Sequence, residues 1–434
     1  MRVCVVGGGI SGLAAATYLR ALPDTHVTVF EQAAHLGGRA DVDADGEHCP
    51  RFFMDDYTHL FALLRQIPLA RGGTVHEALR EARRFSHTDA GWVEISHLYR
   101  FLAREIPWRQ KIAGARSWRP TPLLAEQHLN ANRYGSLRNY SALPLLRMGA
   151  NLFRSKIGYV LPGPTDEYLV DPWVNHLREQ GVEFAAGRRV TGLEPISPVP
   201  LGARGNAPGP DVRHQRRGAR GRAGAGGVRV TTDALSADFE VVVVTAFVPD
   251  LVHLLNSAGL DHTAVETRHT HCVAHTFDLD PREKIFGSGP TFYCRDGINV
   301  LVQPEHHRCV VLCTTSRRTD AAFVLPRVRE FLELSHDPLR AVSRVNQRPG
   351  EGIMIGDYLR PERILRRPFP GLYFAGSCMR NSYPLDSAEG AARSAFNAFC
   401  RIRRDFFPNF LPIGDSQART FEKQAYDMST WGQK

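Results

Sequence analysis

Three glycines near the N-terminus stand at a spacing that can hold a phosphate. Gly7, Gly9 and Gly12 form a G-x-G-x-x-G pattern directly after an apolar, β-branched run, Arg2–Val6. The first glycine allows a tight turn, the second lets the backbone approach a pyrophosphate, and the third lets a following helix pack against the strand. The N-terminus of that helix would then face the phosphates, because its N–H groups attract anions.

An acidic residue follows at the distance that a ribose requires. A second predicted strand, His26–Phe30, is followed by Glu31, about twenty residues beyond the glycines, where a carboxylate can accept both hydroxyls of an adenosine ribose. A carboxylate disfavours a 2′-phosphate, so the pattern fits FAD or NAD better than NADP. Ile10, Ser11 and Gln32 adjoin these positions, and we expect them to contact the same dinucleotide.

The elements that must position these residues are typical of an α/β fold. Apolar runs bounded by glycine or proline predict buried strands, and longer segments with an apolar face predict helices. The run at 241–245 is apolar on both faces, which indicates a central strand. We therefore expect a Rossmann-like, FAD-binding domain whose parallel sheet has strands at 2–6, 26–30, 241–245 and 371–376, with helices at 13–22 and 389–403.

A second group of predicted strands has the alternation of an antiparallel sheet. These strands lie at 271–278, 291–295, 298–303 and 309–314, and a helix at 321–334 follows them. We expect an inserted α+β substrate domain built on this sheet. The predicted boundaries are 1–75, 165–265 and 350–412 for the FAD-binding domain, 76–164 and 266–349 for the substrate domain, and 413–434 for a C-terminal tail.

Most of the positive charge lies in one low-complexity segment. The chain has 434 residues, 43% of them hydrophobic, and a formal net charge of +9. Residues 201–229 hold seven arginines and one aspartate, which leaves a net charge of only +3 for the rest. The segment is rich in glycine and proline and has no aromatic residue. This composition predicts a disordered basic insertion at about 198–227, and no nucleic-acid partner.

The cysteines and the apolar runs indicate a cytoplasmic protein. The eight cysteines are scattered without a C-x-x-C pair, so a disulfide framework is not expected. No apolar run is long enough to span a bilayer, and the chain opens directly on a predicted strand, without a signal peptide. A peripheral membrane contact and the oligomeric state stay open.

Three motifs together resemble the FAD-dependent amine oxidase and phytoene (carotene) desaturase superfamily. Residues 7–12 with Glu31 are similar to its nucleotide motif, 37–39 to its second glycine motif, and 372–376 with 388–391 to its C-terminal flavin motif. The stretches 190–194 and 243–249 also lie where that family returns to its nucleotide domain. Within the superfamily, the residues that look most like the carotene desaturases are 48–57 and 161–164.

The resemblance implies FAD as the cofactor and a set of contacts to it. In this family the N-terminus of the last helix faces the flavin pyrimidine oxygen and favours the anionic reduced ring. Ser377 stands where the family usually has an acid that holds a ribityl hydroxyl, which implies a lower affinity for FAD rather than its loss. The further cofactor contacts that the resemblance implies are Gly38, Arg39, Val190, Gly376, Ser377, Ser387 and Ala388.

Two departures from the family concern the reaction. Its amine oxidases have a tyrosine where this chain has Ser387, and a lysine on the strand that crosses the flavin, where 271–278 has none. Both departures argue against rapid reaction with oxygen. They favour a dehydrogenase (desaturase) that passes a hydride from an apolar, polyene-like or isoprenoid substrate to flavin N5, with an unidentified electron acceptor. The alternatives are a non-redox isomerase of double bonds that uses reduced FAD, an amine oxidase, and a non-catalytic nucleotide-binding protein.

Two histidines and a tyrosine are the candidate catalytic residues. His271 and His275 share one face of a predicted strand with His269, and either of the first two could act as a general base. A metal is not expected, because no carboxylate or cysteine completes a ligand set on that face. Tyr383, with Asn381, directly precedes the last helix and is expected to contact the substrate near the flavin.

Overall fold

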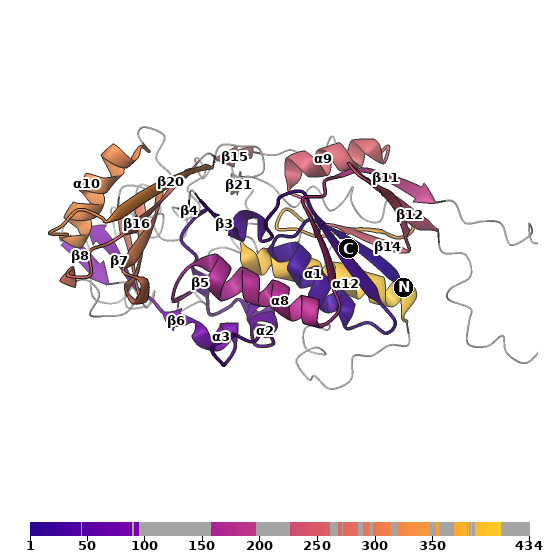
Figure 1. Ribbon diagram of the computed structural model, residues 1–434, viewed down its shortest axis with the longest axis horizontal. Coiled ribbons are helices and arrows are strands. Elements are labelled where there is room, and N and C mark those ends of the chain that lie inside the picture. The colour runs from indigo at the N-terminus through magenta and orange to yellow at the C-terminus, as the bar shows by residue number, and fades with distance from the viewer. Residues whose placement is uncertain are drawn as a thin grey trace, which may run out of the picture.

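Two β-sheets of different construction organise the computed structural model of the protein, and they lie at opposite ends of an elongated molecule (Figure 1). One is a five-stranded parallel sheet, and the other is a seven-stranded, mostly antiparallel sheet. The residues that the structure describes are 1–44, 46–88, 91–94, 158–196, 226–260, 268–270, 272–284, 290–295, 298–313, 319–346, 353–355, 369–379, 381, 383 and 387–408.

The five-stranded sheet confirms the expected Rossmann-like domain. Its strand order is β10-β2-β1-β14-β22, and every neighbouring pair is parallel. The strands are short apolar runs because the sheet is covered on both faces. Their bounds are β1 (Arg2–Val6), β2 (His26–Glu31), β10 (Glu183–Ala186), β14 (Val241–Val244) and β22 (Leu372–Phe374).

Different layers cover the two faces of this sheet. One face packs against α1 (Ile10–Arg20), α8 (Asp171–Glu179) and α12 (Ala388–Phe406) (Figure 1). The other face packs against α9 (Val248–Ser257) and a three-stranded sheet of β11 (Val190–Ile196), β12 (Gly227–Thr232) and β13 (Ser236–Phe239). Residues of β1 alternate between the layers, with Val3 and Val5 on the helical side and Cys4 on the other.

Helix α1 begins three residues earlier than the apolar pattern indicated, at Ile10. Its first turn is pressed against the preceding loop at Gly12, where an added Cβ would lie 1.9 Å from the Gly7 carbonyl oxygen. Only glycine fits such a close approach. The consequence is a helix N-terminus that lies directly over the end of β1.

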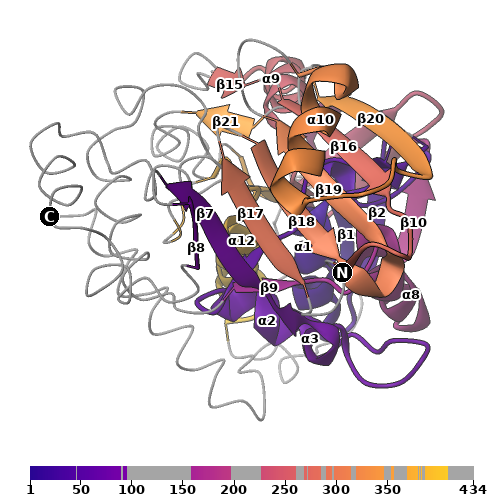
Figure 2. The same cartoon turned by 90° about the vertical axis from the view of Figure 1, so that its left-hand side faces the viewer.

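The seven-stranded sheet confirms the expected antiparallel sheet. Its order is β20-β16-β19-β18-β17-β7-β8, and only the β17–β7 pair is parallel. Helix α10 (Ala321–Leu332) lies across one face, as Figure 2 shows, and buries Val324 and Val328 there. The strand bounds are β7 (Arg83–Thr88), β8 (Gly91–Glu94), β16 (Cys272–Asp278), β17 (Thr291–Arg295), β18 (Ile298–Gln303), β19 (Arg308–Cys313) and β20 (Arg340–Asn346).

Short elements connect the two large sheets. The β3–β4 hairpin lies where the two ends of the molecule meet, and its Gly46 packs against Thr276 of β16 and Val342 of β20. The bounds of the short elements are β3 (Val42–Asp43), β4 (Gly46–Glu47), β5 (Phe53–Met54), α2 (Thr58–Leu64), α3 (Val75–Ala78), β6 (Arg80–Glu81), β9 (Gly158–Val160), β15 (Arg268–Thr270) and β21 (Ile353–Ile355).

The helical segment that precedes β10 is interrupted. It forms a π-helical turn over Asp166–Val170 and then α8. Pro172 lies in the first turn of α8. Because proline has no N–H to donate, the regular hydrogen-bond ladder cannot pass through it. The interruption therefore has a local cause that the sequence contains.

Several sequence expectations lie outside the described residues. These are most of the basic insertion at 198–227, the tail at 413–434, and helices expected at 97–104 and 142–153. Within the described part of the chain, no helix has the length and apolarity needed to cross a membrane. The cysteines whose side chains are described are free thiols.

Candidate functional site

A cleft of about 500 Å³ opens at the carboxyl ends of the parallel strands, the edge at which α/β sheets bind ligands. It is lined by the turn after β1, the first turn of α1, the residues after β2, and the N-terminus of α12. Gly12 lies beneath the cleft and packs α1 onto the turn. The other residues predicted to contact a cofactor all line it, namely Gly7, Gly9, Ile10, Ser11, Glu31, Gln32, Gly38, Arg39, Val190, Gly376, Ser377, Ser387 and Ala388.

The Glu31 carboxylate is held at one side of the cleft by the backbone. Its Oε2 accepts the Gly8 N–H at 2.6 Å, and its Oε1 accepts the Ala33 N–H at 2.9 Å. Each carboxylate oxygen has a second lone pair, so both can still accept a hydroxyl. Glu31 is only 8% exposed, which strengthens such bonds. The arrangement suits the two hydroxyls of a ribose.

The second glycine motif lies beside the first. The Gly37 N–H donates to the Gly8 carbonyl at 2.9 Å, and Gly9 and Gly37 form a parallel bridge. This pairing brings Gly38 and Arg39 against the phosphate-binding turn. Residues 37–39, which resemble the family's second glycine motif, therefore line the cleft beside the first motif.

Arg39 connects two walls of the cleft. Its guanidinium lies 4.3 Å from the centroid of the Phe247 ring, and its Nη2 donates to Ser377 Oγ at 2.9 Å. Ser377 stands at the position where an acid was expected. A serine accepts this hydrogen bond without adding a negative charge to the cleft.

The rim of the cleft near β2 is polar. Asp250, in the first turn of α9, accepts Gln32 Nε2 at 3.1 Å and forms an ion pair with Arg189 Nη2 at 3.1 Å. Both contacts are exposed to solvent. They connect α9 with the residues that follow β2 and β10 at the rim of the cleft.

The N-terminus of α12 faces the cleft from the opposite side. Ser387 is its N-cap, and the Ser387 Oγ accepts the Gly390 N–H at 3.1 Å. Ala388 and Ala391 line the cleft, and their small side chains leave the helix terminus close to any bound group. The positive end of the helix dipole therefore points toward the cofactor position, as the resemblance implied.

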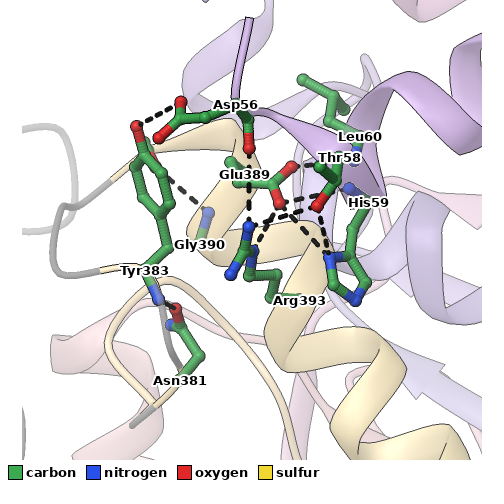
Figure 3. A network of polar contacts seen from close by, with 10 residues as sticks. Asp56, Thr58, His59, Leu60, Asn381, Tyr383, Glu389, Gly390 and Arg393 are labelled. Carbon is green, nitrogen blue, oxygen red and sulfur yellow. Dashed lines mark hydrogen bonds and ion pairs between the residues drawn. The ribbon is translucent and has the colours of Figure 1, made fainter. Parts of the chain in front are cut away.

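The first turn of α12 also carries a fully buried acid, Glu389 (Figure 3). Its carboxylate accepts the backbone N–H groups of His59 at 3.2 Å and Leu60 at 2.9 Å, and it forms an ion pair with Arg393. Although burial opposes the charge, the hydrogen bond from His59 and the charge of Arg393 lower the pKa of Glu389 below its ordinary value. Glu389 thus caps α2, whose own N-cap residue, Tyr57, makes no side-chain cap.

Sequence reasoning did not assign this role to Glu389. The available signal is one acid within a run of small residues, Ala388 to Ala392, at the start of an amphipathic helix. Such a position is buried once the helix packs, so its charge requires partners. Those partners lie more than 300 positions earlier in the chain, and the sequence does not indicate which residues they are.

Tyr383 and Asn381 do not line the cleft, and their expected contact with the substrate stays a prediction. They are 2% and 5% exposed, and they lie behind the start of α12. The Asn381 side chain accepts the Tyr383 N–H at 2.7 Å, which turns the Tyr383 ring inward. The Tyr383 hydroxyl then donates to Asp56 Oδ1 at 3.2 Å (Figure 3).

His275 is also placed away from the cleft, and its expected catalytic role stays a prediction. It is 1% exposed and lies on the face of the seven-stranded sheet that α10 covers, stacked on Phe277. Its ring nitrogens bond Ser343 Oγ at 2.8 Å and the Thr319 carbonyl at 2.9 Å. Burial lowers the pKa of His275. His271 lies outside the described residues, as does the side chain of His269.

The β3–β4 hairpin and the residues after it join the cleft to the seven-stranded sheet. Glu47 is 2% exposed, accepts the Thr165 N–H at 3.0 Å and hydroxyl at 2.7 Å, and pairs with Arg308 of β19. Burial raises the pKa of Glu47. His48 and Cys49, which follow it, line the cleft. Glu47 therefore anchors this loop and does not face the cleft.

The end of the cleft near the seven-stranded sheet is more charged than the sequence indicated. Arg344 of β20 and Arg51 both line it. Arg344 Nη1 donates to the Asp41 carbonyl at 3.2 Å and pairs with Asp43 at 3.4 Å. The expected apolar lining is thus not what the described part of this end shows. Among the described residues, no cluster of histidine, cysteine and acidic side chains is arranged to hold a metal.

Known proteins share this architecture. Residues 5–67 match the family of NAD(P)-binding Rossmann-like domains. A structure assigned as a protoporphyrinogen oxidase from an Exiguobacterium species is similar over 92% of this chain and 98% of that chain, with 18% identity and a TM-score of 0.59. Putrescine oxidase bound to putrescine is similar over 93% of this chain and 99% of that chain, with 15% identity and a TM-score of 0.60. Cyclohexylamine oxidase from Brevibacterium oxydans is similar over 93% of this chain and 99% of that chain, with 14% identity and a TM-score of 0.57.

These likenesses define the class of fold. At such identities they show the fold alone, which the chain shares with these oxidoreductases over 92% to 93% of its length. No curated protein matches the sequence significantly. The residues of the cleft fit FAD, since a carboxylate, two glycine turns and a helix N-terminus line one space that runs from Glu31 to Arg344.

Proposed function

We propose that the protein is an FAD-dependent oxidoreductase that acts as a dehydrogenase, or desaturase, on an apolar, polyene-like or isoprenoid substrate. The single observation that carries the cofactor assignment is the cleft, which brings Glu31, the two glycine motifs and the α12 N-terminus around one space. The substrate class rests on the carotene desaturase resemblance of residues 48–57 and 161–164. The electron acceptor would be a second molecule, such as a quinone.

Different residues of the cleft would bind different parts of FAD. Bound FAD accepts a hydride from carbon. Glu31 would orient the ribose, and the turn at Gly7–Gly9 with the start of α1 would hold the pyrophosphate. Arg39 and Ser377 fix the middle of the cleft by their hydrogen bond. The α12 N-terminus would present its dipole to the ring end.

An amine oxidase is the second candidate, because putrescine oxidase and cyclohexylamine oxidase share the fold. Two observations favour the dehydrogenase. Ser387 stands at the position of the tyrosine that the resemblance led us to expect, and β16 has no lysine within Cys272–Asp278. An isomerase that uses reduced FAD would need the same cleft, so only an experiment separates it from the dehydrogenase.

The cofactor assignment is tested on the purified protein. It should be yellow and should release noncovalent FAD on heating. Recovery of NAD in place of FAD, or a protein that takes up no flavin on reconstitution, would contradict the proposal.

The reaction class is tested by redox behaviour. Anaerobic incubation with a dehydrogenation substrate should bleach the flavin, whereas an isomerase would form product only after pre-reduction and without net electron transfer. We expect slow reoxidation of the dithionite-reduced protein in air, followed by stopped-flow absorbance. Reoxidation within milliseconds, or peroxide release with simple amines, would establish the amine oxidase instead.

A further inference from the structure

An arginine at one end of the cleft has no acidic partner among the described residues. Arg51 lines the cleft and is half-buried. Its Nη2 donates to the Arg39 backbone carbonyl, whereas its buried Nε meets no acceptor within the described part of the chain. No ion pair joins the Arg51 guanidinium to any residue that the structure describes. A half-buried cation without a counter-charge is unfavourable, and an anion in the cleft would offset that cost.

Two other arginines of the cleft have their charge compensated by the protein. Arg344 of β20 pairs with Asp43 at 3.4 Å, and Arg189 pairs with Asp250 at 3.1 Å. Arg51 differs from both, because the described residues place no carboxylate against its guanidinium. The cleft is therefore electrostatically suited to a negative charge next to Arg51.

The neighbours of Arg51 in the chain hold it at the end of the cleft that the seven-stranded sheet forms. Cys49 packs against Ala274 of β16 and Leu312 of β19. Phe52 packs against a cluster that includes a residue of β18. The hairpin that precedes these residues, β3–β4, lies between the two large sheets (Figure 1). The position of Arg51 is thus set by the seven-stranded sheet.

This end of the cleft lies opposite the end that suits a ribose. Glu31 lies at the ribose end, and the turn at Gly7–Gly9 suits the pyrophosphate. In FAD the pyrophosphate follows the adenosine, and the flavin ring is the part farthest from it. The ring would therefore lie where Arg51 and the N-terminus of α12 line the cleft. Both present positive charge to that space.

The ring and the pyrophosphate respond differently to a nearby cation. A hydride carries two electrons and one proton, so a neutral flavin ring that accepts it gains one negative charge. The pyrophosphate is negative in both redox states. A cation beside the ring therefore favours reduced FAD over oxidised FAD, whereas a cation beside the pyrophosphate favours neither state.

We propose that Arg51 stabilises the negative charge that the flavin ring gains when it accepts a hydride. The bond from Nη2 to the Arg39 carbonyl fixes the plane of the Arg51 guanidinium. Its Nη1, which makes no hydrogen bond within the described part of the chain, is left for the ring. The half-buried position strengthens the attraction, because less water screens the charge.

This inference rests on the proposed function, because the negative charge arises only if FAD occupies the cleft. It goes beyond that function by assigning to Arg51 a role in the redox step. The role does not depend on which substrate supplies the hydride. It also separates Arg51 from Glu31 and the glycine turns, which would hold FAD equally in both redox states.

The test compares the affinity for oxidised FAD with the midpoint potential of the FAD-loaded protein. Quenching of FAD fluorescence gives the Kd, and anaerobic equilibration with a reference dye gives the potential. Arg51→Gln removes the charge and keeps an N–H donor, whereas Arg51→Lys keeps the charge. Arg188→Gln is the matched control, because Arg188 lines the same cleft beside Glu31, whose carbonyl accepts the Arg188 N–H at 2.8 Å.

For Arg51→Gln we expect a Kd for oxidised FAD close to that of the wild type and a lower midpoint potential. The decrease should correspond to an affinity for reduced FAD that is weaker by about tenfold or more, because a charge in a half-buried site is lost. Arg51→Lys should recover most of the lost potential, and Arg188→Gln should match the wild type. The wild-type potential should lie above that of free FAD.

Equal midpoint potentials in the wild type and Arg51→Gln would overturn the inference. If the Kd for oxidised FAD rises in the same variant, Arg51 binds the pyrophosphate instead. An equal decrease in Arg188→Gln would also overturn it, since the total charge of the cleft would then explain the effect.

The wild-type protein decides the matter if Arg51→Gln does not fold. A wild-type potential at or below that of free FAD would overturn the inference without any variant. Flavin content is measured first from the visible spectrum. A wild-type protein that binds no flavin would overturn the proposed function, and this inference with it.

Discussion

At the scale of single residues, the cleft depends on acids whose charge is held by specific donors. Glu31 accepts two backbone N–H groups, and Glu389 accepts two more while it pairs with Arg393. One acid faces the cofactor position and the other fixes the helix beside it. A substitution at either site therefore removes several charge-assisted hydrogen bonds at once.

Glu31→Ala should weaken FAD binding. The loss of one charge-assisted hydrogen bond costs about 1.5–3 kcal/mol, which corresponds to roughly a 10- to 100-fold rise in Kd. The affinity of the apoprotein is measured by quenching of FAD fluorescence. Glu183→Ala is the control, because Glu183 lies in the same sheet on β10, bonds Thr28 and does not line the cleft. Equal Kd values for the two variants would show that Glu31 does not bind the cofactor.

Asp56→Asn should change how stability depends on pH. The pKa of Asp56 is raised by burial from 3.8 to about 6, so the folded state holds a proton that the unfolded state releases. The stability that this proton contributes is present below 3.8 and is lost as pH rises through about 6. As pH rises from 3.8 to about 6, the Tm of Asp56→Asn should therefore increase relative to the Tm of the wild type. Asp233→Asn, in an exposed turn, is the control. A difference in Tm between Asp56→Asn and the wild type that does not change with pH would contradict the burial of a charge at Asp56.

At the scale of elements, the β3–β4 hairpin joins the two large sheets. Arg344 binds the Asp41 carbonyl, Glu47 binds Thr165 and Arg308, and Gly46 packs between them against the seven-stranded sheet. The residues that follow the hairpin, His48 and Cys49, line the cleft. The position of the hairpin thus sets how this sheet meets the cofactor site.

Gly46→Ala should destabilise the protein more than Gly72→Ala. Both glycines have similar positive φ angles, 96° and 92°, so the backbone strain is nearly matched. A Cβ at Gly46 would lie 2.8 Å from Thr276 Oγ1, whereas nothing lies within 4 Å of one at Gly72. The additional cost at Gly46 should be about 1–3 kcal/mol in urea unfolding. Equal costs would mean that the hairpin does not pack tightly between the sheets.

At the scale of the whole molecule, we expect the basic insertion to be separable from the fold. Its flanking residues, Ile196 and Gly227, are paired across the antiparallel strands β11 and β12. Five residues, 197–201, would still connect them if Gly202–Gly226 were removed. A hairpin loop of this length is common, and the stability of a protein depends only slowly on loop length.

Deletion of Gly202–Gly226 should leave FAD binding and solubility intact. The deleted segment carries six arginines and one aspartate, so the variant should elute earlier from a cation exchanger. Flavin content and size-exclusion chromatography provide the measurement. An aggregated or flavin-free deletion protein would show that the insertion supports the fold.

The amino-acid sequence alone determined the cofactor half of the protein, because its determinants are local. Glycine spacing, an apolar run and a nearby acid all lie within residues 2–31, and the later strand β14 is a run of four valines. A turn that only Gly12 permits needs no distant partner to be predicted. The same reasoning placed the strands of the second sheet, since alternation is also a local property.

Only the tertiary structure decided which side chains meet. His275 was expected to act near the flavin, but it lies with Phe277 on the face of the seven-stranded sheet that α10, a later segment, covers. Tyr383 was expected to contact the substrate, but it bonds Asp56, 327 positions earlier. Glu389 received no role until α2 was packed against α12. Burial and charge pairing depend on contacts between segments distant in the chain, and periodicity within one segment does not contain that information.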